Sequence, residues 1–440
     1  MTTIPSSHLL SQPRISFSDH HFTTLLIGLL ASLTFFNWLQ IDIANFTIRA
    51  VDVFIAFFIF SALILICFDT TISKSEHSLI WIPLFLYLGY MTLMPFLGLM
   101  FRASFDFSHV TYGFRFGLIL VFCAALLLLS PRRRLLYTSL NRSLLFLGYP
   151  ILFVTIGQIL EYAQVLPGGF FLNQSLADMF DIKIDHYMRP PGTFAGPNQL
   201  GWYGAVIFSL SLAFYFTGGG ARWAHISFIH FLIIVASTSR SALLAALFSV
   251  AAMYALSILR TFSGRQTTKP KGIALFILIA LAFSFLVILA ERLGFLRPQS
   301  IFSAFAVITG DFQADGSLAA RFDGWSNALQ AFRDYGFFGF LGDPRVVTGT
   351  IDSGWLNYLA RGGIPLLAFF VLFLLTTTFY TIYNYLASGN QYSLALFGVT
   401  IIIPLGFVPL SALHYTHVMI FTILAFYMGA SDPHRPRGIT

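Results

Sequence analysis

Hydrophobic residues fall in long runs along this chain, and shorter polar stretches separate the runs. A helix needs about 20 predominantly apolar residues to cross the hydrocarbon core of a bilayer. On that criterion the pattern predicts twelve membrane-spanning helices. We expect them at residues 22–41, 50–68, 79–101, 112–130, 143–162, 199–217, 222–238, 240–259, 273–290, 363–386, 393–411 and 414–430.

Two long polar segments interrupt these runs, at residues 163–198 and 291–362. The second is dense in Arg, Asp, Gly and Trp, and we expect it to carry the active site. Apolar residues recur within it at spacings of three and four, which predicts an amphipathic helix lying on the membrane surface. That stripe consists of Leu318, Phe322, Trp325, Leu329 and Phe332.

The basic residues predict the orientation of the helices, because Lys and Arg accumulate on the cytoplasmic side of a membrane. With the N-terminus inside, the basic stretches at 131–142, 260–271 and 435–437 all fall on that side. Both long polar segments then face the opposite side, which in a bacterium is the periplasm. In a bacterium, the pattern would therefore give a multi-pass protein of the inner membrane, with both termini in the cytoplasm and the active site on the periplasmic face.

The composition agrees with this pattern and excludes a soluble globular protein. Hydrophobic residues make up 57% of the chain, charged residues 10%, and the mean hydropathy is +0.78. The net charge of +7 is spread between the hydrophobic runs, which favours contact with anionic lipid over nucleic acid. The expected fold class is therefore all-α, with a single polytopic membrane domain over residues 1–440.

Catalytic motifs of other enzyme classes are missing from the sequence. It contains no P-loop, no Gly-rich dinucleotide turn, no Gly-x-Ser-x-Gly elbow, no His-Glu-x-x-His and no Asp-x-Asp pair. Cys67 and Cys123 lie in apolar runs, where small packing residues are common, so they support neither a disulfide nor a thiol metal site. We therefore expect no metal and no cofactor.

Two polar clusters stand at the ends of predicted spans. Prolines and glycines between Arg189 and Gly201 predict a rigid, tightly turned loop that would hold Arg189 and Asn198 near the membrane interface. The alternative is a loop that caps a helix, with Arg189 held by interfacial phosphates. Arg240, flanked by serines and a threonine, is costly in a membrane unless it faces a polar cavity or an anion such as phosphate. The alternative is an arginine that marks a helix boundary.

Two further clusters lie in the second polar segment. Arg321 stands with Asp323, Trp325 and Asn327 on the predicted amphipathic helix, a pattern that a solvated helix would also explain. Asp352 precedes Ser353, Gly354 and Trp355 just above a span, where a carboxylate beside aromatic rings could act as general base for a sugar hydroxyl. The alternative for Asp352 or Ser353 is the N-cap of the next helix.

In combination these clusters resemble the O-antigen polymerase and O-antigen ligase superfamily of bacterial inner-membrane glycosyltransferases. The resemblance rests on four motifs in order, over residues 185–370. They are Arg189-x-x-Gly192 leading to Pro197-Asn198-x-x-Gly201, Ser239-Arg240-Ser241, Arg321-x-x-x-Trp325, and Asp352-Ser353 with Gly363 after nine further residues.

The resemblance implies a metal-independent transfer of a glycan from undecaprenyl diphosphate to an acceptor hydroxyl. By position, Arg240 and Arg321 match the family's diphosphate-binding arginines, and Arg189 is a further candidate. Converging guanidinium groups would neutralise the diphosphate leaving group, and direct attack would invert the sugar if Asp352 removed the acceptor proton. The supporting candidates are Asn198, His186, Asp343, Trp325 and Trp355.

One departure from the family pattern concerns the base. The ligase branch has a histidine where this chain has Asp352, which favours the polymerase branch. An aspartate of ordinary pKa is a weak base, so Asp352 would need a raised pKa or would mainly orient the hydroxyl, with Asp343 and His186 as reserve candidates.

Three functions remain as hypotheses. The first is a polymerase that builds O-antigen, capsule or exopolysaccharide from lipid-linked repeat units, with a flippase and a chain-length regulator as partners. The second is a ligase that moves finished glycan to a lipid A core or a protein. The third is a transporter or flippase, which the scarcity of charge at the span centres argues against.

Overall fold

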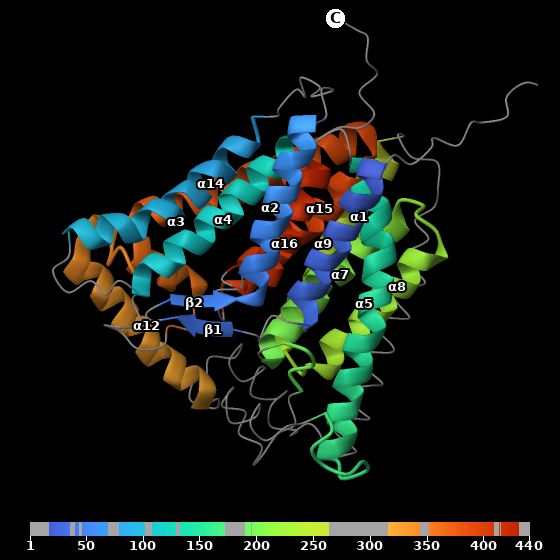
Figure 1. Cartoon of the computed structure of the whole chain (residues 1–440), viewed down its shortest axis with the longest axis horizontal. Helices are drawn as coiled ribbons and strands as arrows, with labels where there is room; N and C mark the ends of the chain where they lie inside the picture. Colours follow the sequence, from blue (N-terminus) through green and yellow to red (C-terminus); the bar gives the residue numbers. More distant parts are fainter. Residues whose placement is uncertain are drawn as a thin grey trace, which may run out of the picture.

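The computed structural model describes residues 17–35, 40–43, 46–68, 79–101, 108–128, 133–171, 190–194, 196–263, 316–343, 351, 353–408, 413 and 415–430. Helices dominate these residues and pack side by side in one bundle (Figure 1). Six of them are long and apolar enough to cross a membrane, and five are shorter apolar helices. The predicted all-α polytopic class is confirmed.

Eleven of the twelve predicted spans coincide with a helix, and the span predicted at 273–290 lies outside the described residues. The agreement follows from the length of the apolar runs. A long apolar run that crosses lipid forms a helix, because a helix pairs all of its backbone N–H and C=O groups within the segment. The helices are α1 (Phe17–Phe35), α2 (Ala50–Phe68), α3 (Trp81–Phe101), α4 (Ser108–Leu128), α5 (Arg133–Tyr162), α7 (Pro197–Phe216), α8 (Ala221–Ala236), α9 (Arg240–Phe262), α14 (Gly354–Ser388), α15 (Gln391–Gly406) and α16 (Thr416–Gly429).

A short hairpin stands where the first predicted span was expected to end. α1 stops at Phe35, and strands β1 (Gln40–Ile43) and β2 (Phe46–Arg49) pair antiparallel, with Gln40 opposite Arg49. The hairpin leads directly into α2, whose first turn is capped when the Arg49 backbone N–H donates to Asp52 Oδ2 at 3.1 Å.

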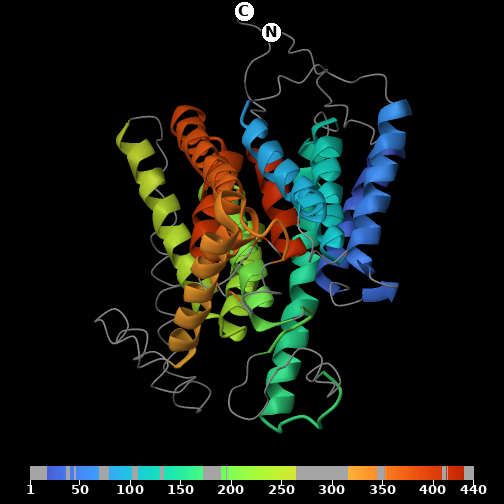
Figure 2. The same cartoon turned by 90° about the vertical axis from the view of Figure 1, so that its left-hand side faces the viewer.

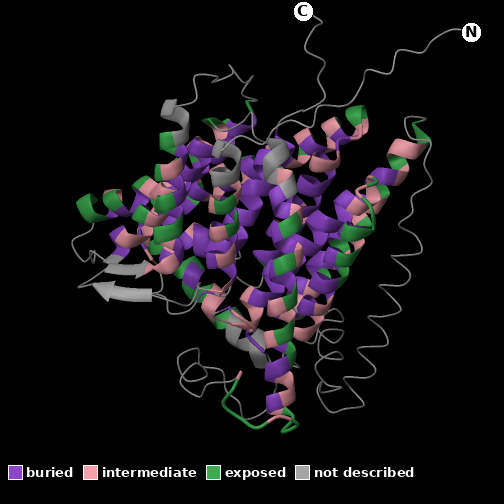
Figure 3. Ribbon diagram, turned by 45° about the vertical axis from the view of Figure 1, so that its right-hand side comes forward, coloured by how far each residue is buried: buried purple, intermediate pink, exposed green. Residues whose placement is uncertain are grey.

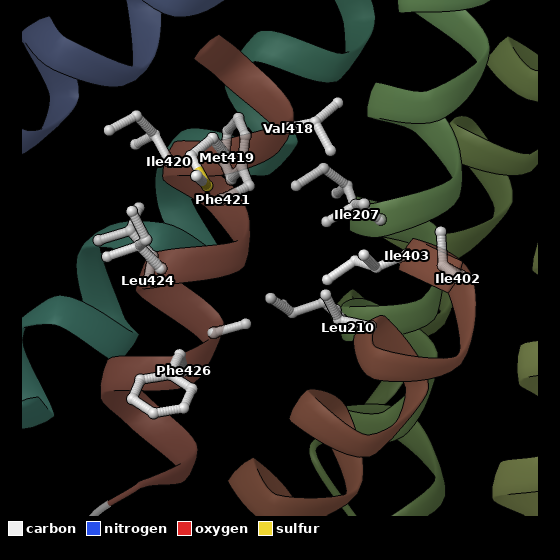
Figure 4. Close-up of a cluster of buried hydrophobic side chains, with 14 of the residues drawn as sticks. Ile207, Leu210, Ile402, Ile403, Val418, Met419, Ile420, Phe421, Leu424 and Phe426 are labelled. Carbon is white, nitrogen blue, oxygen red and sulfur yellow. The ribbon is translucent and has the colours of Figure 1, made fainter. Parts of the chain in front are cut away.

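α7 forms the centre of the bundle and is buried along most of its length. It packs against α8, α9, α15 and α16, and Figure 4 shows side chains of α7, α15 and α16 pointing toward one another. Gly201 and Gly204 allow neighbouring segments to approach α7 closely. A Cβ at Gly204, for example, would lie 2.8 Å from Ile234 Cγ1 of α8. Figure 3 shows that the ribbon at the middle of the bundle is coloured mostly as buried. Phe57, Phe60 and Phe379 are exposed on its outside, as expected for lipid-facing positions.

The predicted amphipathic helix is present as α12 (Gly316–Tyr335), at the edge of the bundle beside α14 (Figures 1 and 2). The sequence predicted an apolar stripe on a helix that rests on the membrane surface, and other residues of α12 pack against the bundle. Ala328 and Ala331 are buried against Ile351 and Ala360, whereas Phe322 and Leu329 are 40% and 41% exposed. Small residues therefore dock the helix, and Phe322 and Leu329 of the apolar stripe face outward.

α14 begins earlier than the span predicted at 363–386 and contains a break at Gly363, with φ 65° and ψ −158°. Pro365 has no backbone N–H, so the Arg361 carbonyl loses its helical partner. The segment after the 3₁₀ helix η3 (Gly336–Phe338) supplies backbone N–H groups that replace the missing helical donors. Phe340 N donates to the Ala360 carbonyl at 2.8 Å, and Leu341 N donates to the Arg361 carbonyl at 2.6 Å.

Candidate active site

The first two sequence motifs meet at one end of the bundle. The Ser239 hydroxyl donates to Asn198 Oδ1 at 3.4 Å, which joins the turn before α9 to the first turn of α7. Gly201 makes this contact possible, because a Cβ there would lie 2.6 Å from Ser239 Cβ. Arg240 is the first residue of α9, so its backbone lies at this junction.

The start of α16 lies at the same end. His417 Nε2 is 3.3 Å from the Gln199 carbonyl of α7, and the His417 ring lies 4.8 Å from the ring of Phe194. Phe194 belongs to the loop that precedes α7 and carries the Arg189 motif. The loop, α7, α9 and α16 therefore come together at one face.

The start of α14 joins this face through the end of α15. Gly354 N donates to the Phe407 carbonyl at 2.8 Å, and Trp355 Nε1 donates to the Pro404 carbonyl at 3.3 Å. Ser353 is the N-cap, because its hydroxyl accepts from Leu356 N at 3.5 Å. The capping alternative is thus realised by Ser353. Four helices, α7, α9, α14 and α16, begin at this face. The N-terminus of each carries a partial positive charge, which would favour the binding of an anion there.

α5 holds the Arg189 loop at this face. Gln158 Nε2 donates to the Gly192 carbonyl at 3.0 Å, and its Oε1 accepts from Gly192 N at 2.9 Å. One turn further along, Glu161 Oε1 accepts from Phe170 N and Phe171 N, both at 2.7 Å. Two buried side chains of α5 therefore fix the backbone on either side of residues 172–189, which lie outside the described residues.

A buried ion pair lies beneath the connection between η3 and α14. Arg361 is 1% exposed, and its Nη2 lies 3.3 Å from Asp343 Oδ1, whose side chain is 12% exposed. The Arg361 guanidinium also lies 4.5 Å from the ring centre of Tyr112 on α4. Asp343 N donates to His109 Nδ1 at 3.1 Å, so α4 contacts both members of the pair.

The structure places the predicted site residues unequally. Arg189, His186 and Asp352 lie outside the described residues, although Ile351 and Ser353 on either side of Asp352 are buried. Arg240 and Arg321 are placed by their helices, at the start of α9 and in the second turn of α12. Nothing is described of their side chains, so the convergence of the arginines stays a prediction.

The supporting candidates are described. Asn198 lies at the shared face, and Trp355 packs against Phe370 and Phe407 with ring centres 5.5 Å and 5.8 Å away. Trp325 lies edge-on to Phe322 on α12, with ring centres 5.0 Å apart. Among the described residues, no group of three or more His, Cys, Asp or Glu side chains is arranged to hold a metal ion.

Sequence reasoning named Arg361 only as a neighbour of the Asp352 cluster, and it gave neither Arg361 nor Gln158 a role. Both fall in or beside apolar runs, where a single polar residue reads as tolerated within a helix. The available signal at Arg361 was the pairing of an arginine with Gly362, Gly363 and Pro365, a combination that predicts a broken helix with a free carbonyl.

Fold and site together define a multi-pass membrane protein whose first two polar motifs meet at one end of its helix bundle. Residues 225–371, from α8 to the middle of α14, match the family described as O-antigen ligase. This match supports the O-antigen polymerase and ligase superfamily for the chain and glycan transfer of that type, and it does not distinguish the two branches. No curated protein matches the chain.

Proposed function

We propose that this protein is a polysaccharide polymerase of the bacterial inner membrane. It transfers a growing glycan from undecaprenyl diphosphate to a hydroxyl of another lipid-linked repeat unit, on the periplasmic face. The product would be O-antigen, capsule or exopolysaccharide. A flippase would supply the repeat units, and a chain-length regulator would be a natural partner.

The observation that carries this proposal is the junction of Asn198 with Ser239, at the end of the bundle where α14 also begins. It joins the first two motifs of the resemblance in space, although they are about forty residues apart in sequence. The family match spans the second, third and fourth motifs, which lie within residues 225–371. A face of this kind suits a substrate whose lipid lies in the bilayer and whose sugar reaches water.

In the proposed mechanism, Arg240 and Arg321 bind the diphosphate, with Arg189 as a third donor. Guanidinium groups can hold phosphate oxygens bidentately, and they stabilise the negative charge that grows as the glycosidic bond breaks. The acceptor hydroxyl attacks the anomeric carbon while Asp352 orients it or takes its proton, which gives inversion. Undecaprenyl diphosphate leaves with the electron pair of the broken bond.

The structure gives Asp343, one of the two reserve candidates for the base, a different task. The Asp343 carboxylate is already the counter-ion of the buried Arg361, so protonating it would leave that guanidinium without its ion-pair partner. This engagement favours Asp352 over Asp343 as the group that acts on the acceptor. Asn198, Trp325 and Trp355 are proposed to support the sugar and phosphate contacts.

A ligase is the second candidate, because the family match carries that description. The aspartate at position 352, where the ligase branch has a histidine, supports the polymerase instead. A flippase finds less support, because charged residues are scarce at the span centres and the first two polar motifs meet at one end of the bundle.

A strain that lacks this chain separates the candidates when its polysaccharide and its lipid-linked intermediates are resolved on gels. Loss of a polymerase leaves single repeat units, either on their acceptor or on undecaprenyl diphosphate. Loss of a ligase leaves long chains stranded on undecaprenyl diphosphate, and that result would reject the polymerase. Loss of a flippase leaves single lipid-linked units facing the cytoplasm, where added periplasmic glycosidase cannot reach them.

A further inference from the structure

Arg361 is the most deeply buried charge in the described candidate site, and packing alone does not explain it. A guanidinium that is 1% exposed carries a large desolvation cost, which one carboxylate and one aromatic ring only partly offset. An apolar side chain of similar size would fill the same space without that cost. The ion pair is better explained by the geometry that it imposes on its surroundings.

Arg361 holds the connection between α12 and α14 at two points. Its carbonyl, freed by Pro365, accepts from Leu341 N at 2.6 Å, and its guanidinium pairs with Asp343 two residues further along. The connection is also pressed close to the helix break. A Cβ at Gly339 would lie 2.6 Å from Gly363 N, and both glycines have positive φ. We call this joint, residues 339–343 with residues 360–363, the α12–α14 clamp.

The clamp lies between the two elements that carry the third and fourth motifs. α12 ends at Tyr335 and runs through η3 directly into the clamp, and its docking residue Ala328 shares a buried cluster with Ala360. On the other side, the first segment of α14 extends from Gly354 to the clamp. The position of α12 relative to the start of α14 is therefore set at the clamp.

We propose that Arg361, acting through Asp343, is a positioning residue for glycan transfer. It fixes α12, which carries Arg321, against the helix that begins two residues after Asp352. This role rests on the proposed function. Arg361 itself is too deeply buried to touch the substrate, so it contributes through the alignment of the residues that do.

The kinetic test uses the full chain in lipid nanodiscs, with the single repeat unit on undecaprenyl diphosphate purified from the deletion strain. Asp343→Asn and Arg361→Met are expected to lower kcat about 10- to 100-fold, because small misplacements of reacting groups carry penalties of that size, while KM changes little. Arg361→Lys and Asp343→Glu keep the pair and should recover part of kcat. Asp52→Asn is the matched control, since it removes the Arg115–Asp52 ion pair of 3.2 Å and should leave kcat unchanged.

A distance measurement tests the clamp without reference to activity. Spin labels are placed at Ser326 on α12 and Phe379 on α14, which are both exposed, after Cys67 and Cys123 have been changed to Ala. Asp343→Asn should broaden the distance distribution between the labels, and Asp52→Asn should not. An unchanged distribution in Asp343→Asn would overturn the clamp, whatever the activity.

The remaining outcomes are also decisive. A broadened distribution with an unchanged kcat would overturn the positioning role. If the unsubstituted chain transfers no glycan although the distances respond, then the proposed function fails together with the role of Arg361 in it, and the clamp stands as a structural element alone.

Discussion

Gln158 pairs with both backbone polar groups of Gly192: its Nε2 donates to the carbonyl at 3.0 Å, and its Oε1 accepts from the amide at 2.9 Å. The Gln158 side chain is buried in α5, and Gly192 lies three residues after Arg189. A Cβ at Gly192 would lie 2.9 Å from Thr155 Oγ1 of the same helix, so the loop is pressed against α5 at this point. α5 is therefore the support from which the Arg189 loop leaves.

Replacing Gln158 by Ala is expected to reduce chain elongation. The change leaves two backbone groups of Gly192 without partners, at a cost of about 1–3 kcal/mol for each group that stays buried. The measurement is the polysaccharide ladder of the deletion strain carrying the variant, normalised to the amount of protein in the membrane. Gln164→Asn, at an exposed position on the turn after α5, is the control. A ladder of normal length in Gln158→Ala would mean that transfer does not depend on this support.

Arg240→Ala, Arg321→Ala and Asp352→Asn are each expected to lower the transfer rate about 100-fold or more. In the proposed mechanism the two arginines stabilise the charge that develops on the diphosphate, and Asp352 orients or deprotonates the acceptor hydroxyl. Arg240→Lys keeps the charge but not the bidentate fork, so it should recover only part of the rate. The rate is measured with purified variants and the lipid-linked repeat unit. Arg222→Ala serves as the control, because Arg222 lies in the first turn of α8, at the end of that helix away from Arg240. Full elongation by all three variants at normal expression would refute the site.

Gly363→Ala is expected to destabilise the protein and to slow transfer. The backbone conformation at Gly363 is one that only glycine adopts readily, at a cost of about 1–3 kcal/mol for other residues. The new Cβ would also lie 2.7 Å from Gly339 N. The midpoint of thermal unfolding in detergent should fall. Gly89→Ala in α3 meets no atom within 4 Å and should leave the midpoint unchanged or slightly higher, so equal midpoints for the two variants would contradict the close approach at the clamp.

Removal of divalent metal is expected to leave the transfer rate unchanged. In the proposed mechanism, guanidinium groups neutralise the diphosphate, which is the task that a metal ion performs in many other phosphate-dependent enzymes. The measurement is the initial rate of the purified protein before and after treatment with a chelator. A rate that collapses with chelator and returns with added magnesium or manganese would count against this mechanism.

The sequence predicted helix positions well where an apolar run and a helix have the same bounds. α2 has the predicted ends, whereas α5 starts at Arg133 instead of residue 143, because polar residues can continue a helix beyond the hydrocarbon. The β1–β2 hairpin was missed, since a window of about 20 residues averages over strands of four. α12 was predicted with its apolar stripe, whereas its docking through two alanines was not, because small residues add little to an apolar pattern.

The sequence could predict only those residues of the candidate site that belong to local motifs. Arg361 pairs with Asp343 because Pro365 breaks the helix and η3 folds back onto it, and no periodic pattern indicates such a return. Gln158 reads as a polar residue within a span, and its partner is a backbone group that carries no sequence signal. Both residues act through long-range contacts, which spacing alone cannot reveal.

The break at Gly363 divides α14 into segments that meet different surroundings. About 25 of its 35 residues follow the break, a length of about 38 Å that exceeds the roughly 30 Å of a bilayer's hydrocarbon layer. If the long segment spans the hydrocarbon layer, we expect the shorter segment before the break to lie at headgroup depth. In a thinner bilayer the long segment must tilt to avoid hydrophobic mismatch, and the tilt changes its angle to the short segment. If the protein transfers glycan as proposed, we therefore expect the acyl chain length of the host lipid to regulate it, with transfer in reconstituted vesicles fastest at one thickness and slower on either side.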